Sequence, residues 1–546
     1  MSVNPTKIFL PSIIIGDPMS FYDDILELIL TKQIQTKEEL HREKINLCKK
    51  YKIDMIPRDS EILAHLHVDF TDEETTYALL RKKSTRTISG VTIVAVMTSP
   101  ASCPHGRCIP CPGGPEQDTP QSYTGHEPAA LRAISNNFDP YLQTKSRLEQ
   151  LKAIGHSIDK IDFIVMGGTF TSRHPEYQEW FVKRCYDGLN AKKSQTLLRA
   201  KRLNEHAKSR CIGLTVETRP DWFRLHHADL SLRLGATRVE FGVQTIDDEV
   251  LHMICRGHTV EDTFYATRIA KEAGFKVCYH MMPGLPGSDK KKDLAAFQML
   301  FTDDRLKPDM IKIYPTLIIK GTKLYDLWKA GGFKPLTTEQ ATILIAQMKK
   351  DIPPWVRIQR IQRDIPASKI AAGVMKSNLR QLVEIEMKNH GTTCRCIRCR
   401  EIGLQSLKKK IDVDTLSLLV IRHDYPASGG HEIFLSLEDP TSDLVVGYLR
   451  LRDIIHPHRW ELMREPCMLI REVKILGREL SMGVRSPEGF QHRGYGKQLI
   501  TEAERICIED FNKKQLFVLS GVGVKPYYRK IGFFDSGVYL KKRVHA

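Results

Sequence analysis

Short apolar runs alternate with amphipathic segments along the middle of the chain, from residue 91 to about residue 365. The runs are rich in Val, Ile and Phe and have the length of buried strands, while the segments between them repeat apolar residues at helical spacing. This alternation predicts an α/β fold of βα units around a parallel sheet. The predicted strands are Val91–Met97, Ile161–Met166, Cys211–Val216, Arg238–Val243, Lys276–His280 and Met310–Tyr314.

Cysteines, glycines and polar residues gather directly after these predicted strands. Cys103, Cys108 and Cys111 lie within nine residues after the first strand. In parallel α/β folds, ligands bind at the carboxyl ends of the strands, so the turns are expected to build one site. Three thiolates without a fourth nearby suit an iron–sulfur cluster with one open iron; a structural zinc knot and chance clustering are the alternatives. The other turns are Gly167–Thr169, Glu217–Asp221, Gln244–Thr245 and Gly284–Gly287.

The N-terminal region, residues 1–88, is predicted to be helical and basic. Apolar residues recur at helical spacing in Phe21–Leu30 and Lys37–Tyr51. The region ends in the basic run Arg81–Arg86, which is either a solvated helix end or an arm that contacts phosphates; its place beside the cysteine loop favours the arm.

The last 136 residues, 411–546, are predicted to form a separate α+β domain. Leu416–Ile421 and Glu432–Leu437 read as a hairpin. A glycine-rich turn, Phe490–Lys497, opens an amphipathic helix that runs to about Asp510. Such a turn presents backbone N–H groups and the positive end of the helix dipole to a phosphate. The remaining predicted strands are Leu444–Arg452, Met468–Leu476 and Gln515–Ser520.

A second cysteine cluster lies in a basic linker, residues 386–410. Cys394, Cys396 and Cys399 are three thiols within six residues, which suits a zinc ion with one further ligand; a second iron–sulfur cluster is the alternative. His390 and Cys211 are both candidates for the fourth ligand.

Composition adds a partner class. The 546 residues carry a formal net charge of +17, with a pI of about 9.2 and 41% hydrophobic residues. An excess this large indicates a polyanionic partner, most simply a nucleic acid. The chain has no run of eighteen apolar residues and no signal-peptide pattern, so a cytoplasmic protein without a membrane span is expected. In that compartment thirteen cysteines favour metal binding over disulfides.

The cysteine loop and the turns after the strands resemble the radical S-adenosylmethionine enzymes. The resemblance implies a partial parallel (β/α)6 barrel, a 4Fe–4S cluster on Cys103, Cys108 and Cys111, and S-adenosylmethionine bound beside Gln244. The loop has four and two residues between its cysteines instead of three and two. Thr169 stands where the superfamily has a glutamate after the glycine pair.

The C-terminal domain resembles the GCN5-related N-acetyltransferases (GNAT), on its glycine-rich turn and on Gly521–Phe533. The resemblance implies that the turn holds the coenzyme A pyrophosphate, and that Tyr527 and Tyr528 face the thioester; two aromatic core residues are the alternative. The residues it implies for acetyl-CoA are Glu472, Val473, Lys474, Ile475, Phe490, Gln491, His492, Arg493, Gly494, Gly496 and Tyr528.

Together the two domains resemble the catalytic subunit of Elongator in its free-standing form. Segments that carry this match include Gln121–Gly125, Asp139–Thr144 and Gln362–Pro366. The family implies that Lys160, just before the second strand, also contacts acetyl-CoA, with Tyr527 and Tyr528 as catalytic residues beside it. The implied domains are an N-terminal tRNA-binding region 1–88, a radical domain 89–385, a metal-binding linker 386–410 and an acetyltransferase domain 411–546.

The family resemblance implies that the wobble uridine of tRNA receives a carboxymethyl group at C5. A 5′-deoxyadenosyl radical would take a hydrogen from the acetyl methyl of acetyl-CoA. The carbon radical would add to C5, an electron and a proton would leave, and water would cleave the thioester. A base that reacts must be splayed from its stack, which favours the anticodon loop. An electron donor is required, and Elongator-like subunits or self-association are the expected protein partners.

Two rival functions come from other classes. One is a protein lysine acetyltransferase with a structural iron–sulfur domain, and the other is a tRNA-binding scaffold that holds metal only for stability. The positive charge of the chain argues against a basic protein tail as substrate.

Overall fold

The computed structural model describes residues 18–66, 79–80, 87–408, 411, 413–480 and 489–545. The basic run Arg81–Arg86 lies outside these residues. The chain divides into two compact units, one of residues 1–86 with Leu148–Ser157, and one of Thr87–Arg147 with Ile158–Ala546. No helix in the described ranges is long and apolar enough to cross a membrane.

Helices form in the described residues 18–66 of the first unit, and the helical spacing predicted the first two of them. They are α1 (Pro18–Leu30), α2 (Lys37–Lys50) and α3 (Asp59–Ala64). Thr36 and Glu39 form a capping box at the start of α2, which satisfies backbone N–H groups that a helix end leaves open. The helices bury a small apolar core of their own.

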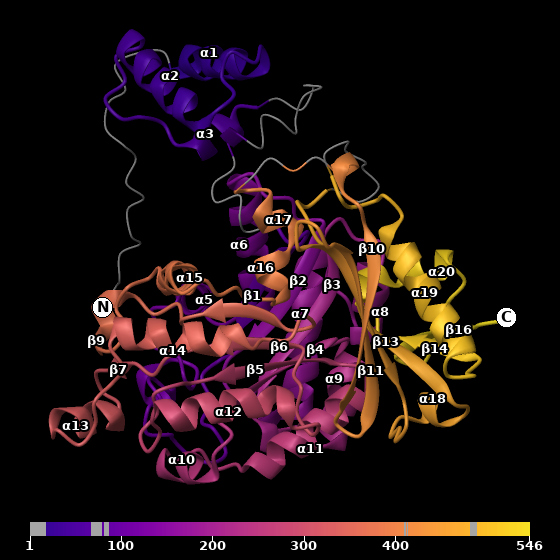
Figure 1. The fold of residues 1–546 in the computed structure, drawn as a ribbon. Helices are drawn as coiled ribbons and strands as arrows, with labels where there is room; N and C mark the ends of the chain where they lie inside the picture. Colours follow the sequence, from indigo (N-terminus) through magenta and orange to yellow (C-terminus); the bar gives the residue numbers. More distant parts are fainter. Residues whose placement is uncertain are drawn as a thin grey trace. The chain divides into compact units, whose positions relative to one another are not determined.

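The second unit begins with a curved sheet of seven parallel strands (Figure 1). The strands follow one another in chain order across the sheet, which makes a half-barrel and confirms the predicted α/β class. They are β1 (Thr92–Met97), β2 (Lys160–Met166), β3 (Arg210–Thr218), β4 (Arg238–Gln244), β5 (Lys276–Met281), β6 (Met310–Ile313) and β8 (Arg357–Ile361).

Strand β8 is a correction to the predicted six-unit barrel. It pairs with β6 and adds a seventh strand to the sheet. Its five residues include two arginines, so it lacks the continuous apolar pattern of a buried parallel strand. Arg357 is nevertheless buried, because it forms an ion pair with Glu401 of the linker at 2.9 Å.

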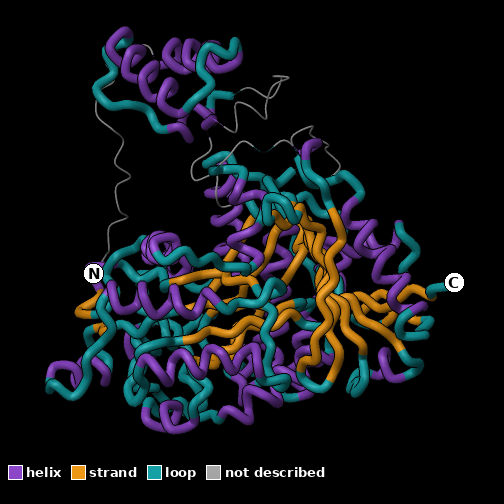
Figure 2. The backbone as a smooth tube through the Cα atoms, viewed as in Figure 1, coloured by secondary structure: helices purple, strands orange, loops and turns teal. Residues whose placement is uncertain are grey.

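Helices connect successive strands and cover the outer face of the sheet (Figure 2). Phe241 of β4 packs edge to face on Phe223 beneath this layer, at 5.2 Å between ring centroids. The helices of eight or more residues are α5 (Pro128–Ser135), α6 (Pro140–Ala153), α7 (Pro175–Asn190), α8 (Leu197–Asn204), α9 (Leu225–Leu234), α11 (Val260–Glu272), α12 (Lys290–Thr302), α14 (Thr338–Lys350) and α15 (Leu379–Asn389). Shorter elements are α10 (Asp248–Met253), α13 (Lys323–Lys329), β7 (Ile318–Ile319), β9 (Ile370–Ala372), and α16 (Ile397–Arg400) and α17 (Ile402–Gln405) of the linker.

The C-terminal domain is a second seven-stranded sheet, of order β10-β11-β12-β13-β14-β16-β15. Its neighbours are antiparallel except β13 and β14, which run parallel, and helix α19 packs on β13. This order agrees with the predicted acetyltransferase architecture. The elements are β10 (Leu419–Ala427), β11 (Gly430–Asp439), β12 (Leu444–Asp453), α18 (Trp460–Met463), β13 (Cys467–Ile475), α19 (Tyr495–Glu509), β14 (Gln515–Val518), α20 (Lys525–Lys530), β15 (Phe534–Ser536) and β16 (Tyr539–Arg543).

The predicted first hairpin was too short and began too early. Its first strand starts at Leu419 and continues to Ala427, where a tight turn through Ser428 leads directly into β11. Pro426 lies inside the longer strand, because β10 is the edge strand of the sheet, where a proline need not break a ladder hydrogen bond.

The half-barrel and the second sheet meet across a network of fully buried charges. Arg471 of β13 contacts both carboxylate oxygens of Asp309, at 2.6 and 2.9 Å, and Glu432 of β11 at 2.7 Å. Asp309 lies directly before β6, so the guanidinium ties the amino end of the barrel strands to the second sheet. Burial alone raises the pKa of Asp309, but the charges of Arg471 and its neighbours outweigh burial and hold it below its ordinary value. Further members are Lys271, Glu272, Arg450 and Arg452.

We expect Arg471→Met to destabilise the second unit, because it leaves two buried carboxylates short of a partner. Breaking a buried ion pair in this way lowers the free energy of unfolding by about 3–5 kcal/mol. Urea denaturation of the whole protein measures the change. The matched control is Arg505→Met on α19, where an exposed arginine pairs with Glu502 and Glu509 and stability should change little. Equal, small effects in both variants would contradict the buried network.

Candidate functional site

The first cysteine loop follows β1 at the carboxyl end of the sheet. Cys103, Cys108 and Cys111 are all at least nine-tenths buried. The loop is held by its own backbone, since the Gly106 N–H donates to the carbonyl of Cys103 and the Cys111 N–H to that of Cys108. Each sulfur also has a polar neighbour, which are Thr169 at 3.5 Å from Cys103, His105 at 3.0 Å from Cys108, and Gln121 at 3.2 Å from Cys111.

This donor set fits a 4Fe–4S cluster better than a single metal ion. The described cysteines with sulfur atoms all within 4.8 Å of one another are those of the linker, and Cys103, Cys108 and Cys111 do not form such a group. A cluster binds each thiolate at a different iron, so its ligands stand apart, whereas one zinc ion draws its ligands together. Thr169 takes the place of the missing glutamate, and its hydroxyl lies 3.5 Å from the Cys103 sulfur instead.

Gln244 ends β4 in a conformation that points to a binding role. The backbone φ of Gln244 is +76°, a value that residues other than glycine rarely adopt. Its backbone carbonyl accepts from the Met282 N–H at 2.8 Å. The buried side-chain Oε1 has no hydrogen-bond partner in the described part of the protein. Strain and an unpaired buried acceptor together are typical of ligand sites.

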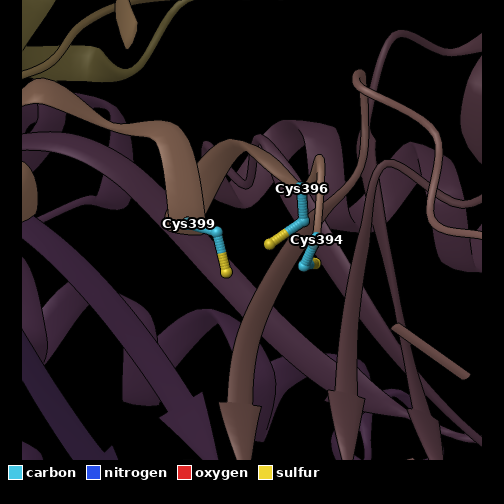
Figure 3. A group of neighbouring side chains, drawn as sticks. All are labelled: Cys394, Cys396 and Cys399. Atoms are coloured by element: carbon cyan, nitrogen blue, oxygen red, sulfur yellow. The ribbon is translucent and has the colours of Figure 1, made fainter. Parts of the chain in front are cut away.

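The second cysteine cluster is a compact trio in the linker. Cys394, Cys396 and Cys399 have sulfur atoms within 4.8 Å of one another, and Figure 3 shows the three side chains as close neighbours. Hydrogen bonds from the other two thiols lower the pKa of Cys396 well below its ordinary value, so the trio favours a thiolate.

Neither predicted fourth ligand joins this trio. The side chain of His390 is 69% exposed at the end of α15, and its Nδ1 contacts the Glu386 carbonyl at 3.0 Å. Cys211 is buried in β3 and its Sγ donates to the Gly213 carbonyl at 3.4 Å. Cys211 belongs to β3, and His390 is the C-cap residue of α15, so the backbone of each holds its side chain away from the trio.

The linker fastens both domains around the trio. Glu401, fully buried, accepts from Arg357 of β8 and from Ser89 before β1. Arg400 pairs with Glu438 of β11 and with Asp443 at 2.6 Å. The trio therefore lies beside the junction of the half-barrel and the second sheet.

The predicted pyrophosphate turn leads into α19 as expected. His492 and Gly494 have φ values of +65° and +90°, and Gly494 is the N-cap of the fifteen-residue helix. The glycine supplies a left-handed conformation without steric cost, which opens the helix N-terminus. Phe490 is buried in the core, and Arg493 pairs with Asp414 at 2.9 Å.

Lys160 and Gln491 meet although 331 residues separate them. The Lys160 ammonium at the start of β2 donates to the Gln491 Oε1 at 2.6 Å. The Gln491 amide also donates to the carbonyls of Gly90, before β1, and Ile475, at the end of β13. Burial lowers the pKa of Lys160. The pyrophosphate turn is thus locked to the amino end of the half-barrel, which the sequence could not show.

Glu472 and Lys474 of β13 face this junction. Burial alone raises the pKa of Glu472, but the charges of Lys276 and Arg450 hold it below its ordinary value. Burial lowers the pKa of Lys474. Val473 and Ile475 pack against the core of the second sheet.

The tyrosine pair lies on α20. Tyr528 is buried in the core of the second sheet, whereas Tyr527 is 39% exposed, and their rings meet edge to face at 5.3 Å. A Cβ on Gly496 of α19 would come 3.3 Å from the Tyr527 hydroxyl. The missing side chain at Gly496 therefore leaves the Tyr527 hydroxyl close to the first turn of α19, beside the predicted pyrophosphate turn.

The two groups of predicted site residues lie at opposite ends of the half-barrel. Lys160 is the first residue of β2, while the cysteine loop follows the last residue of β1, its partner strand. A seven-residue strand spans roughly 20 Å. The turns that follow the strands therefore belong to a site at the carboxyl end of the sheet. Lys160, at the amino end, is not part of that site.

A ladder of charged side chains crosses the inner face between these ends, and the sequence analysis missed it. Arg238 pairs with Asp162 at 3.1 Å and with Glu240 at 3.4 Å. Glu240 in turn contacts His280 at 2.8 Å and pairs with Lys312 of β6. At the carboxyl end, Lys312 pairs with Glu217 at 3.7 Å, and the Tyr123 hydroxyl donates to Glu217 at 2.8 Å.

The ladder is an ionic network and not a metal site. Glu240, Cys278 and His280 bring ligand-type atoms within 4.8 Å of one another. Burial opposes the charge of Lys312, but the Glu240 carboxylate outweighs it and holds the Lys312 pKa above its ordinary value. The Lys312 ammonium is thus the cation that balances the Glu240 carboxylate. The signal in the sequence was a charged or imidazole side chain inside otherwise apolar strands, at Asp162, Glu240, His280 and Lys312.

Comparisons with known proteins agree with this architecture. Residues 100–299 match the Radical SAM superfamily, residues 308–389 the Radical_SAM C-terminal domain, and residues 19–88 the ELP3 N-terminal domain. The superfamily match implies a 4Fe–4S cluster and S-adenosylmethionine as cofactors.

Similar proteins extend over almost the whole chain. A tRNA uridine(34) acetyltransferase of Methanocaldococcus infernus is 51% identical over 494 residues, 89% of this chain and 92% of the relative. Elongator complex protein 3 of Drosophila melanogaster is 41% identical over 532 residues, 95% of each chain. A solved structure of Methanocaldococcus infernus Elp3 with an N-terminal deletion has a TM-score of 0.74 and 46% identity, covering 84% of this chain and 100% of that one. The chain belongs to the Elongator complex protein 3 and tRNA uridine(34) acetyltransferase family and is a radical S-adenosylmethionine enzyme.

Proposed function

We propose that this enzyme attaches the acetyl carbons of acetyl-CoA to C5 of the wobble uridine of tRNA and forms 5-carboxymethyluridine. In the overall change a C–H bond of the acetyl methyl and the C5–H bond of uracil break, and a C–C bond forms between these carbons. The methyl hydrogen would pass to the 5′-deoxyadenosyl group of S-adenosylmethionine, which is cleaved to methionine and serves as the oxidant. The C5 hydrogen would leave as a proton with one electron, which balances the electron that the donor supplies. Water cleaves the thioester and releases coenzyme A. The named relatives act on tRNA uridine 34, which supports this substrate.

One observation carries the proposal, namely the contact between Lys160 and Gln491. It joins the half-barrel to the predicted pyrophosphate turn at 2.6 Å. An acetyltransferase domain with an unrelated, structural neighbour would not need a buried lysine of that neighbour inside its coenzyme site. Burying an ammonium is costly unless a partner accepts from it, so this placement favours a functional role.

We infer that acetyl-CoA is held by the turn and by both domains. The Gln491 side chain contacts the half-barrel. The backbone N–H groups of Gln491, His492, Arg493 and Gly494 are therefore the groups that we propose to face the pyrophosphate. The dipole of α19 favours the negative charge there. Tyr527, the exposed member of the tyrosine pair, is the side chain best placed to reach the thioester.

At the opposite end, the cluster and S-adenosylmethionine, when bound, supply the radical that activates an unreactive C–H bond. The cysteine loop holds the three thiolates out of water, and Gln244 offers a buried acceptor to the methionine compound. A net charge of +17 attracts the tRNA phosphates. The donor of the electron and Elongator-like subunits or self-association complete the proposed partners.

We propose a zinc ion for the linker trio Cys394, Cys396 and Cys399. Thiolates within 4.8 Å of one another suit one tetrahedral ion, with a fourth ligand that the described residues do not identify. The ion would brace the linker where Glu401 and Arg400 fasten both domains.

The proposed reaction is tested by mass spectrometry of nucleosides from unmodified tRNA. The tRNA is incubated without oxygen with reconstituted enzyme, acetyl-CoA, S-adenosylmethionine and a reductant. We expect a carboxymethyluridine peak that needs acetyl-CoA and falls at least 100-fold in Cys108→Ala, because the cluster then lacks a ligand.

Cys185→Ala is the matched control, since this thiol on α7 is buried like Cys108 and lies outside both clusters. Release of 5′-deoxyadenosine without modified uridine would refute the substrate. No product at all from enzyme with a full cluster would favour a protein acetyltransferase or a scaffold.

The acetyl-CoA site is tested separately by calorimetric binding. Lys160→Met and Gln491→Leu should each weaken acetyl-CoA binding about tenfold or more, and the double variant should lose less than the sum, because the pair acts as one unit. Lys183→Met on α7, which also removes a partly exposed lysine with a carboxylate partner, is the control. Additive losses would show that the two residues do not cooperate.

Zinc removal should loosen the junction of the two domains. We expect about one zinc ion per chain by elemental analysis, lost in Cys396→Ser, together with a lower melting temperature. A second iron–sulfur cluster would instead give iron and labile sulfide above the amount that one cluster requires.

A further inference from the structure

The turn between α10 and α11 packs directly on the cysteine loop. The Ile109 N–H, inside the loop, donates to the carbonyl of Ile254 at 3.0 Å. Gly257 has a φ of +70°, and a Cβ there would come 2.7 Å from the Cβ of His105. Only glycine allows this approach, so residues 254–258 form a close-fitting clamp over the loop.

Arg256 extends from this clamp to a cluster ligand. One guanidinium nitrogen lies 3.6 Å from the Sγ of Cys108, and the other donates to the carbonyl of Gly242 at 2.6 Å. The side chain is only 8% exposed, and its Nε has no hydrogen-bond partner among the described residues. A buried guanidinium without a carboxylate partner is costly unless an anion lies beside it.

Arg219 adds a second buried cation to the same clamp. It is 2% exposed, pairs with Asp221 at 2.7 Å and donates to the carbonyl of Gly257 at 2.9 Å. Asp221 neutralises Arg219, whereas no carboxylate in the described part of the chain lies within ion-pair distance of Arg256. Arg256 therefore supplies the uncompensated charge next to the cysteine loop.

We propose that Arg256 is a positioning residue that raises the reduction potential of the iron–sulfur cluster. Reduction adds one electron to the cluster and breaks no bond, and the electron comes from an external one-electron donor. The added negative charge is stabilised by a fixed cation in a buried, low-dielectric setting and by its hydrogen bond to the ligand sulfur. The arginine thus reduces the demand on the donor.

This inference rests on the cluster of the proposed function and is independent of the tRNA substrate. Wild-type protein that binds no iron would remove the proposed function, whereas a failure of Arg256 alone leaves that function intact. The two results are therefore distinguishable before any activity is measured.

The test is a redox titration of the reconstituted cluster, followed by electron paramagnetic resonance, in wild type, Arg256→Met and Arg256→Lys. In Arg256→Met the ratio of reduced to oxidised cluster at a fixed potential should fall about tenfold, which is 59 mV for a one-electron couple. Arg256→Lys keeps the charge and should restore most of the ratio. Arg268→Met, an exposed arginine on α11, is the control and should leave the ratio unchanged.

Two results would overturn the proposal. The first is an unchanged ratio in Arg256→Met with full iron content. The second is a loss of iron in Arg256→Met together with an Arg256→Lys variant that regains the iron content but not the wild-type reduction potential. The arginine would then act on cluster assembly alone.

Discussion

The buried pairing of Arg471 with Asp309 and Glu432 is the constraint on which the arrangement of the two catalytic domains depends. All three side chains are fully buried, so the charges are stable only while the half-barrel and the second sheet stay together. This contact keeps β13 against the amino end of the barrel strands. It thereby places Lys160 beside Gln491, so that the proposed coenzyme cradle includes residues of both domains.

A fixed junction also separates the two proposed chemistries by the length of a strand. The cysteine loop stands at the carboxyl end and the Lys160–Gln491 contact at the amino end, with the ionic ladder from Asp162 to Tyr123 between them. Along the ladder each carboxylate lies beside a cation. In the proposed reaction, the acetyl arm and the target base must therefore cover this distance, since the protein does not bring its two ends together.

The sequence predicted those parts of the fold that local patterns encode. Six of the seven barrel strands, the helices of the N-terminal unit and α19 followed from apolar spacing and turn chemistry. Strand β8 was missed because its two arginines break the apolar pattern, and Arg357 is satisfied there by Glu401, a residue of the distant linker. The Lys160–Gln491 contact, the clamp at Arg256 and the ladder depend on residues far apart in the chain, for which periodicity carries no signal. His390 and Cys211 were plausible zinc ligands by type, but their own elements hold them elsewhere.

Transfer of an isotope label between the substrates shows whether the two proposed cofactor sites serve one reaction. Enzyme, unmodified tRNA and reductant are supplied with acetyl-CoA that carries three deuterium atoms on its methyl group. We expect 5′-deoxyadenosine that has gained one deuterium atom and a carboxymethyl group that retains two deuterium atoms. Unlabelled 5′-deoxyadenosine formed alongside modified tRNA would contradict it, because the acetyl methyl would then not be the group that the radical attacks.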